Sequence, residues 1–211
     1  MKTLYRAIAG AVGLVAVAGQ YWLVTQGKGG AALPVSSVHF FSFFTILTNL
    51  IAAGAMLVPV VAPDSRLGRF LDRPSVRTAI VGYIVIVGTV YYTLLRKLDN
   101  ATGLHLYLEY VLHYVTPPLF VIDWLLFVPK GEIGWRNGLD SLAYPIAYLV
   151  WTMVHGAFAG WYPYPFIDVS KLGYGRMLLN SAGLILAFLA LELLLVALDR
   201  LVKQYQSGAA P

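Results

Sequence analysis

Few side chains in this sequence can carry out nucleophilic or acid–base chemistry within its long apolar stretches. The chain has no cysteine, which excludes disulfides, thiolate zinc sites, iron–sulfur clusters and a cysteine nucleophile. Its four histidines, one of which is His113, can act as general bases toward a hydroxyl such as that of Thr45. A threonine hydroxyl is a poor nucleophile on its own, so the chemistry to be expected is that of a threonine activated by a histidine.

One apolar stretch carries several titratable groups on a shared face. His105, Glu109 and His113 are spaced by four residues, so they line up along one side of a helix. Glu109 could accept a hydrogen bond from His113 and fix its tautomer, as the third member of a catalytic triad does. Two alternatives stay open. His39, His105, Glu109, His113 and His155 could hold zinc, or the polar face could serve a proton or ion path.

These side chains belong to a chain with the composition of a membrane protein. Of its 211 residues, 59% are hydrophobic and 12% are charged, and the mean hydropathy is +0.71. Soluble domains carry about 25% charged residues, and disordered chains are poor in apolar residues, so both classes are excluded. The net charge of +5 is expected to come from basic loops that flank membrane spans, and no nucleic-acid partner is predicted.

The apolar residues fall into six stretches, each long enough to cross about 30 Å of hydrocarbon as a helix. The stretches are residues 4–26, 38–62, 77–98, 104–128, 139–160 and 176–199. Helices are required because lipid cannot satisfy exposed backbone groups. The sequence therefore predicts an all-α, polytopic membrane protein in which residues 1–211 form a single domain of six transmembrane helices.

The distribution of basic residues predicts the orientation of these helices. Ten lie on one side, namely Lys2, Arg6, Arg66, Arg69, Arg73, Arg77, Lys130, Arg136, Arg200 and Lys203. Five lie on the other, namely Lys28, Arg96, Lys97, Lys171 and Arg176. By the positive-inside rule both termini are cytoplasmic, and the short loops suit a bacterial inner membrane. All four histidines then lie in the extracytoplasmic half, where we expect the site.

Thr45 and His113 are predicted to lie at the same depth in the membrane. Each is nine residues from the outer start of its helix, at Ser36 and Leu104, which is about 13 Å at 1.5 Å per residue. If the two helices are neighbours, the hydroxyl and the imidazole meet as a nucleophile and its base. The alternative is that Thr45 bonds a carbonyl of its own helix and His113 is a structural histidine.

Other polar and aromatic side chains are candidates for supporting roles. Thr48 and Asn49 lie a turn below Thr45, where either could donate to an oxyanion or form a hydrogen bond across helices. The substrate-pocket candidates near the outer side are His39, His155, Tyr164 and Phe166. The aromatic residues among them could equally belong to the aromatic belt at the membrane interface.

Two further features within the spans are expected to be structural. Pro117 and Pro118 remove backbone donors and should kink the helix below His113. Asp123 and Glu192 lie inside apolar stretches, and we expect each to pair with a basic residue.

Three short motifs resemble a known family. The segment FFTILTNL at residues 43–50 resembles the helix-2 motif of the androgen-induced membrane hydrolase family. These proteins are multi-span threonine hydrolases that cleave fatty acid esters of hydroxy fatty acids. His113 followed by Pro118 is similar to the family's catalytic histidine segment, and residues 154–156 with residues 164–166 are similar to a later stretch.

The resemblance implies that Thr45 is the nucleophile and His113 the base, with no metal and no cofactor, in a bacterial-type relative. Glu109 departs from the family pattern, which has an uncharged residue there, so its triad role rests on its spacing alone. The predicted function is hydrolysis of a membrane lipid ester. The alternatives are a small transporter or channel that uses the same polar cluster for binding, and a metal-dependent membrane hydrolase that uses the His and Glu side chains.

Overall fold

The structure, a computed structural model, describes residues 1–98 and 100–208. It is 82% helical, and no strand occurs in that part of the chain. The helices divide into two compact units, Met1–Lys130 and Gly131–Pro211, which are described one at a time. The prediction that the whole chain is a single domain stays a prediction.

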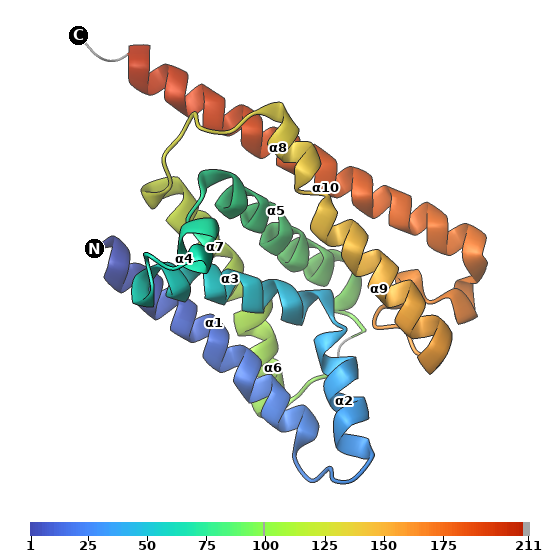
Figure 1. Ribbon diagram of the computed structural model, residues 1–211. Helices are drawn as coiled ribbons and strands as arrows, with labels where there is room; N and C mark the ends of the chain where they lie inside the picture. Colours follow the sequence, from blue (N-terminus) through green and yellow to red (C-terminus); the bar gives the residue numbers. More distant parts are fainter. Residues whose placement is uncertain (99, 209–211) are drawn as a thin grey trace. The chain divides into compact units, whose positions relative to one another are not determined.

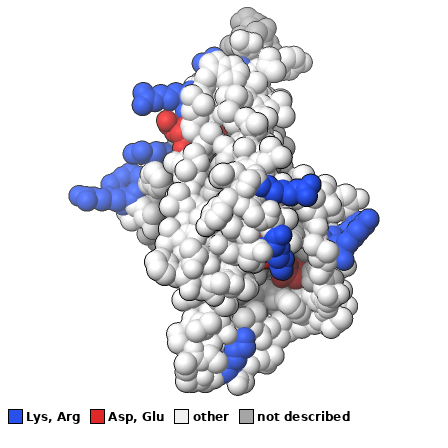
Figure 2. Space-filling view, turned by 90° about the vertical axis from the view of Figure 1, so that its right-hand side faces the viewer, with Lys and Arg blue, Asp and Glu red and all other residues white. Residues whose placement is uncertain are grey.

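Six helical segments are long and apolar enough to cross a membrane, which confirms the predicted fold class at this level. They are Lys2–Thr25, Phe44–Val61, Pro74–Leu95, Gly103–Phe127, Trp135–Ala159 and Val169–Tyr205. Large apolar side chains on them are exposed, as lipid-facing residues must be. Figure 2 shows one face on which Lys and Arg side chains stand out from a surface made mostly of uncharged residues. The side of the membrane on which the termini lie stays a prediction.

Four helices of the first unit, α1 (Lys2–Thr25), α3 (Phe44–Val61), α5 (Pro74–Val90) and α7 (Thr116–Phe127), pack in a ring (Figure 1). Small residues let α1 approach its neighbours closely. A Cβ atom at Gly10 would lie 2.6 Å from Leu57 of α3. The interior of the ring is filled by apolar side chains such as Ala55, Ile84 and Phe120, each at most 1% exposed.

The predicted span 38–62 is not one helix. It is divided into α2 (Ala32–Phe41) and α3, which runs in a different direction (Figure 1). At the break, Phe43 has an extended backbone with ψ 129°, and the Ser42 hydroxyl donates to the carbonyl of Val38 at 2.7 Å. The prediction that Thr45 lies nine residues inside its helix is therefore wrong, since Thr45 is the second residue of α3.

The fourth span contains a π-helical turn in place of a simple kink. It consists of α6 (Gly103–Tyr110), the π-helix η2 (Val111–Val115) and α7. Pro117 and Pro118 cannot donate to the preceding turn, and the amide of Thr116 bonds to the carbonyl of Val111, five residues back. The predicted distortion by the prolines is thus confirmed, but it takes the form of a wider turn around His113.

An ion cluster of four buried or partly buried residues ties the first unit together. It consists of Arg6, Asp72, Arg77 and Asp123. The Asp123 carboxylate accepts hydrogen bonds from Arg6 at 2.7 Å and from Arg77 at 3.1 Å, so its predicted pairing is confirmed. Arg77 is 0% exposed and lies in α5, although the charge pattern assigns it to a loop. The remaining short helix of this region is α4 (Arg66–Leu71).

The second unit consists of α8 (Trp135–Asp140), α9 (Ala143–Ala159), η3 (Pro165–Ile167) and α10 (Val169–Gly208), which Gly173 interrupts. The amide of Gly131 donates to Asp199 of α10 at 2.8 Å. Glu192 of α10 is 1% exposed, and its Oε1 has no hydrogen-bond partner among the described residues. The predicted pairing of Glu192 with a basic residue is therefore wrong.

Candidate active site

The side chains of Thr45 and His113 meet between α3 and η2. Thr45 Oγ1 lies 3.3 Å from His113 Nε2, which confirms that the two residues are neighbours. His113 is 5% exposed, whereas Thr45 is half-buried. The arrangement brings a reachable hydroxyl into hydrogen-bond distance of a shielded imidazole, as a nucleophile and its base require.

The backbone of α6 selects the tautomer of His113. Its Nδ1 lies 2.9 Å from the carbonyl oxygen of Glu109. A carbonyl only accepts hydrogen bonds, so Nδ1 carries the proton of the neutral ring. Nε2 is then an acceptor that faces the Thr45 hydroxyl. The imidazole therefore presents the nitrogen lone pair that a general base needs.

The Glu109 carboxylate lies beside the same nitrogen, as the helical spacing predicts. Its Oε2 is 3.2 Å from His113 Nδ1, and its Oε1 accepts a hydrogen bond from Gln20 Nε2 at 2.7 Å. His105, whose side chain is 46% exposed, lies 3.7 Å from Oε1. Gln20 is 2% exposed, and sequence reasoning missed it. The sequence signal for Gln20 was a single amide side chain in an apolar helix. The small residues of that helix had suggested only close helix packing.

An aromatic ring fixes the plane of the imidazole. Tyr91 stacks on His113 with ring centroids 3.8 Å apart and an interplanar angle of 15°. Tyr91 is 4% exposed and begins the π-helix η1 (Tyr91–Leu95). Two π-helical turns thus carry the two stacked rings, and such turns are common at functional sites. An aromatic residue in an apolar run gives no sequence signal for this role.

Asn49 joins the helices that carry the dyad. Its Nδ2 donates to the carbonyls of Thr45 at 2.9 Å and Leu112 at 3.3 Å, and its Oδ1 accepts from Thr116 at 2.6 Å. The Leu112 carbonyl is the one that the π-helical turn deprives of its backbone donor. Both amide hydrogens are used in these bonds, so Asn49 forms the predicted hydrogen bond across helices and has no amide hydrogen left for the alternative oxyanion role. Thr48, the other candidate oxyanion donor, is 0% exposed in α3.

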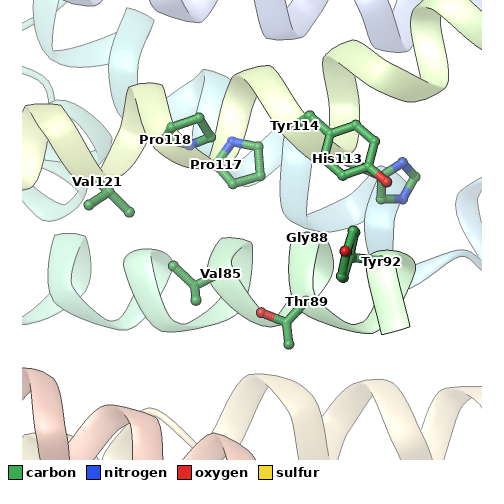
Figure 3. Close-up of a pocket in the computed structure, with 9 residues that line it drawn as sticks. All are labelled: Val85, Gly88, Thr89, Tyr92, His113, Tyr114, Pro117, Pro118 and Val121. Carbon is green, nitrogen blue, oxygen red and sulfur yellow. The ribbon is translucent and has the colours of Figure 1, made fainter. Parts of the chain in front are cut away.

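An open groove begins at His113 and runs between α5 and α7. Its volume is about 500 Å³, and it is lined by Val85, Gly88, Thr89, Tyr92, His113, Tyr114, Pro117, Pro118 and Val121. In Figure 3 His113 stands at one end of this groove and Val121 at the other. The groove therefore gives a ligand of elongated shape a place beside the histidine of the dyad.

The remaining pocket candidates do not line this groove. His39 is half-buried in α2. The other three lie in the second unit, where His155 stacks on Trp151 with centroids 5.5 Å apart and Tyr164 stacks on Phe166 at 5.2 Å. Their part in substrate binding stays a prediction.

The described side chains do not gather into a metal centre. In residues 1–98 and 100–208, no three His, Asp or Glu side chains converge in a way that could hold a metal ion. Within the first unit, His39, His105, Glu109 and His113 therefore do not form the zinc site considered from the sequence.

Comparison with known proteins gave no match. No family model fits the chain, and no curated protein and no solved structure is significantly similar to it.

Proposed function

We propose that this protein is an intramembrane lipid ester hydrolase in which Thr45 is the nucleophile and His113 the general base. The observation that carries the proposal is the 3.3 Å contact between Thr45 Oγ1 and His113 Nε2, with the opposite ring nitrogen held by Glu109. The resemblance at residues 43–50 supports fatty acid esters of hydroxy fatty acids, or related membrane lipids, as substrates. No metal or cofactor takes part.

In the first half of the reaction, Thr45 Oγ1 attacks the ester carbonyl carbon while its proton passes to His113 Nε2. The tetrahedral intermediate then expels the alcohol, which takes the proton from His113, and an acyl-threonine remains. In the second half, His113 takes a proton from water, and the resulting hydroxide releases the fatty acid. The proton returns to Thr45, so the enzyme is regenerated.

Two features of the site favour the charges that develop in this reaction. Glu109 Oε2 lies 3.2 Å from His113 Nδ1, so its negative charge stabilises the imidazolium that forms. Thr45 is the second residue of α3, and the positive end of a helix dipole stabilises the oxyanion of the tetrahedral intermediate. The break before α3 thus puts the nucleophile where the helix dipole assists it.

The basic-residue pattern supports an orientation with both termini in the cytoplasm and the dyad in the extracytoplasmic half, and the short loops suit a bacterial inner membrane. A lipid ester already partitions into that environment, so the substrate reaches the site from within the bilayer.

The test is hydrolysis of lipid esters by the purified protein in lipid nanodiscs. Thr45→Val, which keeps the shape but removes the hydroxyl, and His113→Gln should each lower kcat/KM by about 10²–10⁴-fold. The matched control is Thr93→Ala, because Thr93 is exposed and its hydroxyl bonds only the carbonyl of Thr89, at 2.7 Å. Wild-type turnover in either dyad variant contradicts the proposal, and an acyl group trapped on Thr45 in mass spectrometry supports it directly.

One observation in the second unit favours a second candidate function, proton or ion transport. A buried carboxyl without a partner in a membrane span, such as Glu192 Oε1, is a feature of proton and ion paths. Proteoliposomes that hold a pH gradient should then lose it with the wild type but not with Glu192→Gln. The control is Glu132→Gln, at an exposed position. Equal leakage from all three proteins removes this candidate.

A further inference from the structure

We propose that the groove between α5 and α7 binds the acyl chain of the ester and sets the chain length that is hydrolysed. This inference rests on the proposed function. It assigns the acid side of the substrate, and not the alcohol side, to a particular surface of the first unit.

The groove and the dyad share one residue, His113. His113 lines the groove and also meets the Thr45 hydroxyl. The wall beside it is formed by backbone, because a Cβ atom at Gly88 would lie 2.9 Å from the His113 carbonyl oxygen. A chain lying in the groove therefore begins at His113, through which the groove is connected to Thr45.

The side chains that line the groove become less polar with distance from His113. Figure 3 places Tyr92 and Tyr114 near the His113 end, and Val85 and Val121 toward the opposite end. An ester of a long-chain acid has the same polarity, with a polar head and an alkyl tail. The alkyl tail would lie along the apolar part and the ester group near the hydroxyl-bearing residues.

The size of the groove and its openness to the surroundings also suit an acyl chain. The volume of about 500 Å³ lies in the range of small-molecule pockets, and eight residues separate His113 from Val121, or about 12 Å along a helix. Tyr92 is 56% and Tyr114 37% exposed, so the groove is open along its side. A single acyl chain can enter it laterally from the bilayer.

A second groove of the first unit provides a control. It has a volume of about 450 Å³ and is lined by Ile8, Ala11, Val12, Val15, Ala16, Leu108 and Val111. It is apolar as well, but neither Thr45 nor His113 lines it. A bulky residue placed there tests for general effects of surface substitution in lipid.

The experiment measures kcat/KM for a series of p-nitrophenyl esters, from butyrate to stearate, in nanodiscs. Val121→Trp fills the far end of the acyl groove, and the ratio of stearate to butyrate hydrolysis should fall about tenfold or more, as expected when about two methylene groups lose their burial. Thr89→Trp fills the groove closer to His113 and should move the cut-off to shorter chains. Val15→Trp, in the control groove, should leave the ratio as in the wild type.

Each outcome decides the proposal. An unchanged ratio in Val121→Trp, or an equal change in Val15→Trp, overturns it. If Val121→Trp does not fold, Val85→Phe tests the opposite wall in the same way. A change in preference along a matched series of fatty alcohol acetates, but not along the acyl series, assigns the groove to the alcohol and also overturns it. A wild type that cleaves no ester at all refutes the proposed hydrolase function instead.

Discussion

The first unit buries two polar groups of residues at opposite ends of α1. One is the ion cluster of Arg6, Asp72, Arg77 and Asp123. The other, the dyad network, consists of Thr45, His113, Glu109 and Gln20. Arg6 and Gln20 are fourteen residues apart, which is about 21 Å along the helix. Both groups link α1 to the fourth span. They therefore share the same helices, although their side chains differ in chemistry.

The ion cluster is paired and shielded. Arg6, Arg77 and Asp123 are each at most 2% exposed, and the two guanidinium groups balance the two carboxylates. The helical residues of the cluster lie in regular α-helices. Burial of such charges is tolerated only because each has an opposite partner, and none of the four residues lines the groove beside His113.

The dyad network is oriented but accessible. Thr45 is half-buried, and the Glu109 side chain is 20% exposed. The two dyad residues, Thr45 and His113, lie where the backbone is irregular, at the start of α3 and in η2. Buried polarity alone therefore does not distinguish the proposed active site from a structural ion cluster. A reachable nucleophile beside an oriented base, on a distorted backbone, separates the two groups of residues.

Removal of one charge from the ion cluster should have the largest effect on stability. Asp123→Asn leaves Arg6 and Arg77 buried with too little negative charge, so the free energy of unfolding should fall by about 3–5 kcal/mol. Thermal unfolding in detergent measures the change. The control is Asp140→Asn, because Asp140 is 62% exposed and 3.9 Å from Arg136, and its effect should stay below about 0.5 kcal/mol.

The same measurement on His113→Gln separates the two groups of residues. This variant should lose activity but only about 1–2 kcal/mol of stability, the combined cost of a ring stack and about one hydrogen bond. A large drop in its melting temperature, or a negligible one for Asp123→Asn, would mean that the two groups have similar structural roles.

The ring of Tyr91 that stacks on His113 is expected to help orient the imidazole in the dyad network. Tyr91→Leu removes the ring that lies on His113, and kcat should fall by up to about tenfold with KM little changed, since an aromatic pair contributes about 0.5–1.5 kcal/mol. Tyr91→Phe keeps the ring and should restore most of the rate. Ester kinetics with the three proteins check this. A loss of equal size in the Phe variant would show that the phenol hydroxyl, and not stacking, is what matters.

The smallest effect concerns the partly exposed member of the ion cluster. Burial by itself would raise the pKa of Asp72, but the hydrogen bond and charge of Arg6, with the charges of Lys2 and Arg77, outweigh it and hold the pKa below its ordinary value of 3.8. Ionised Asp72 therefore stabilises the fold above pH 3.8, and this contribution is lost as the pH falls through the lowered pKa.

Melting temperatures of the wild type and Asp72→Asn across acidic pH values measure this contribution. The wild type should be the more stable protein at neutral pH, by less than about 1 kcal/mol because the Asp72 side chain is 39% exposed. The difference should shrink toward the acid end of the series. A difference that stays constant with pH would show that the charge of Asp72 is not the cause.

Much of the fold could be predicted from the sequence, because hydropathy and length decide which segments can cross a membrane. The pairing of Thr45 with His113 was also predicted, although the equal depth used to argue it assumed one unbroken helix over residues 38–62. The break before α3 did not, since residues 42 and 43 are neither glycine nor proline and the extended backbone at Phe43 depends on packing. Arg77 looked like a loop residue because its charge gives no hint of its buried partner, Asp123.

The supporting residues of the site were the hardest to predict. Gln20 and Tyr91 are separated from His113 by 93 and 22 residues in the sequence, and only the packing of α1 and α5 against the fourth span brings them together. The sequence left two roles open for Asn49, and the contacts select the hydrogen bond across helices. The π-helical turn leaves the Leu112 carbonyl without its backbone donor, and the side chains of Asn49 and Thr116 bond it instead.

The side-chain amide of Asn49 makes the correct packing of α3 against the fourth span a condition of the proposed activity. If α3 slid along the fourth span by one helical turn, Asn49 would lose its bond to Leu112 and Thr45 would lose His113 in the same movement. In the proposed mechanism a misregistered molecule is then also an inert one, so a half-assembled protein would not hydrolyse the lipids that surround it during insertion.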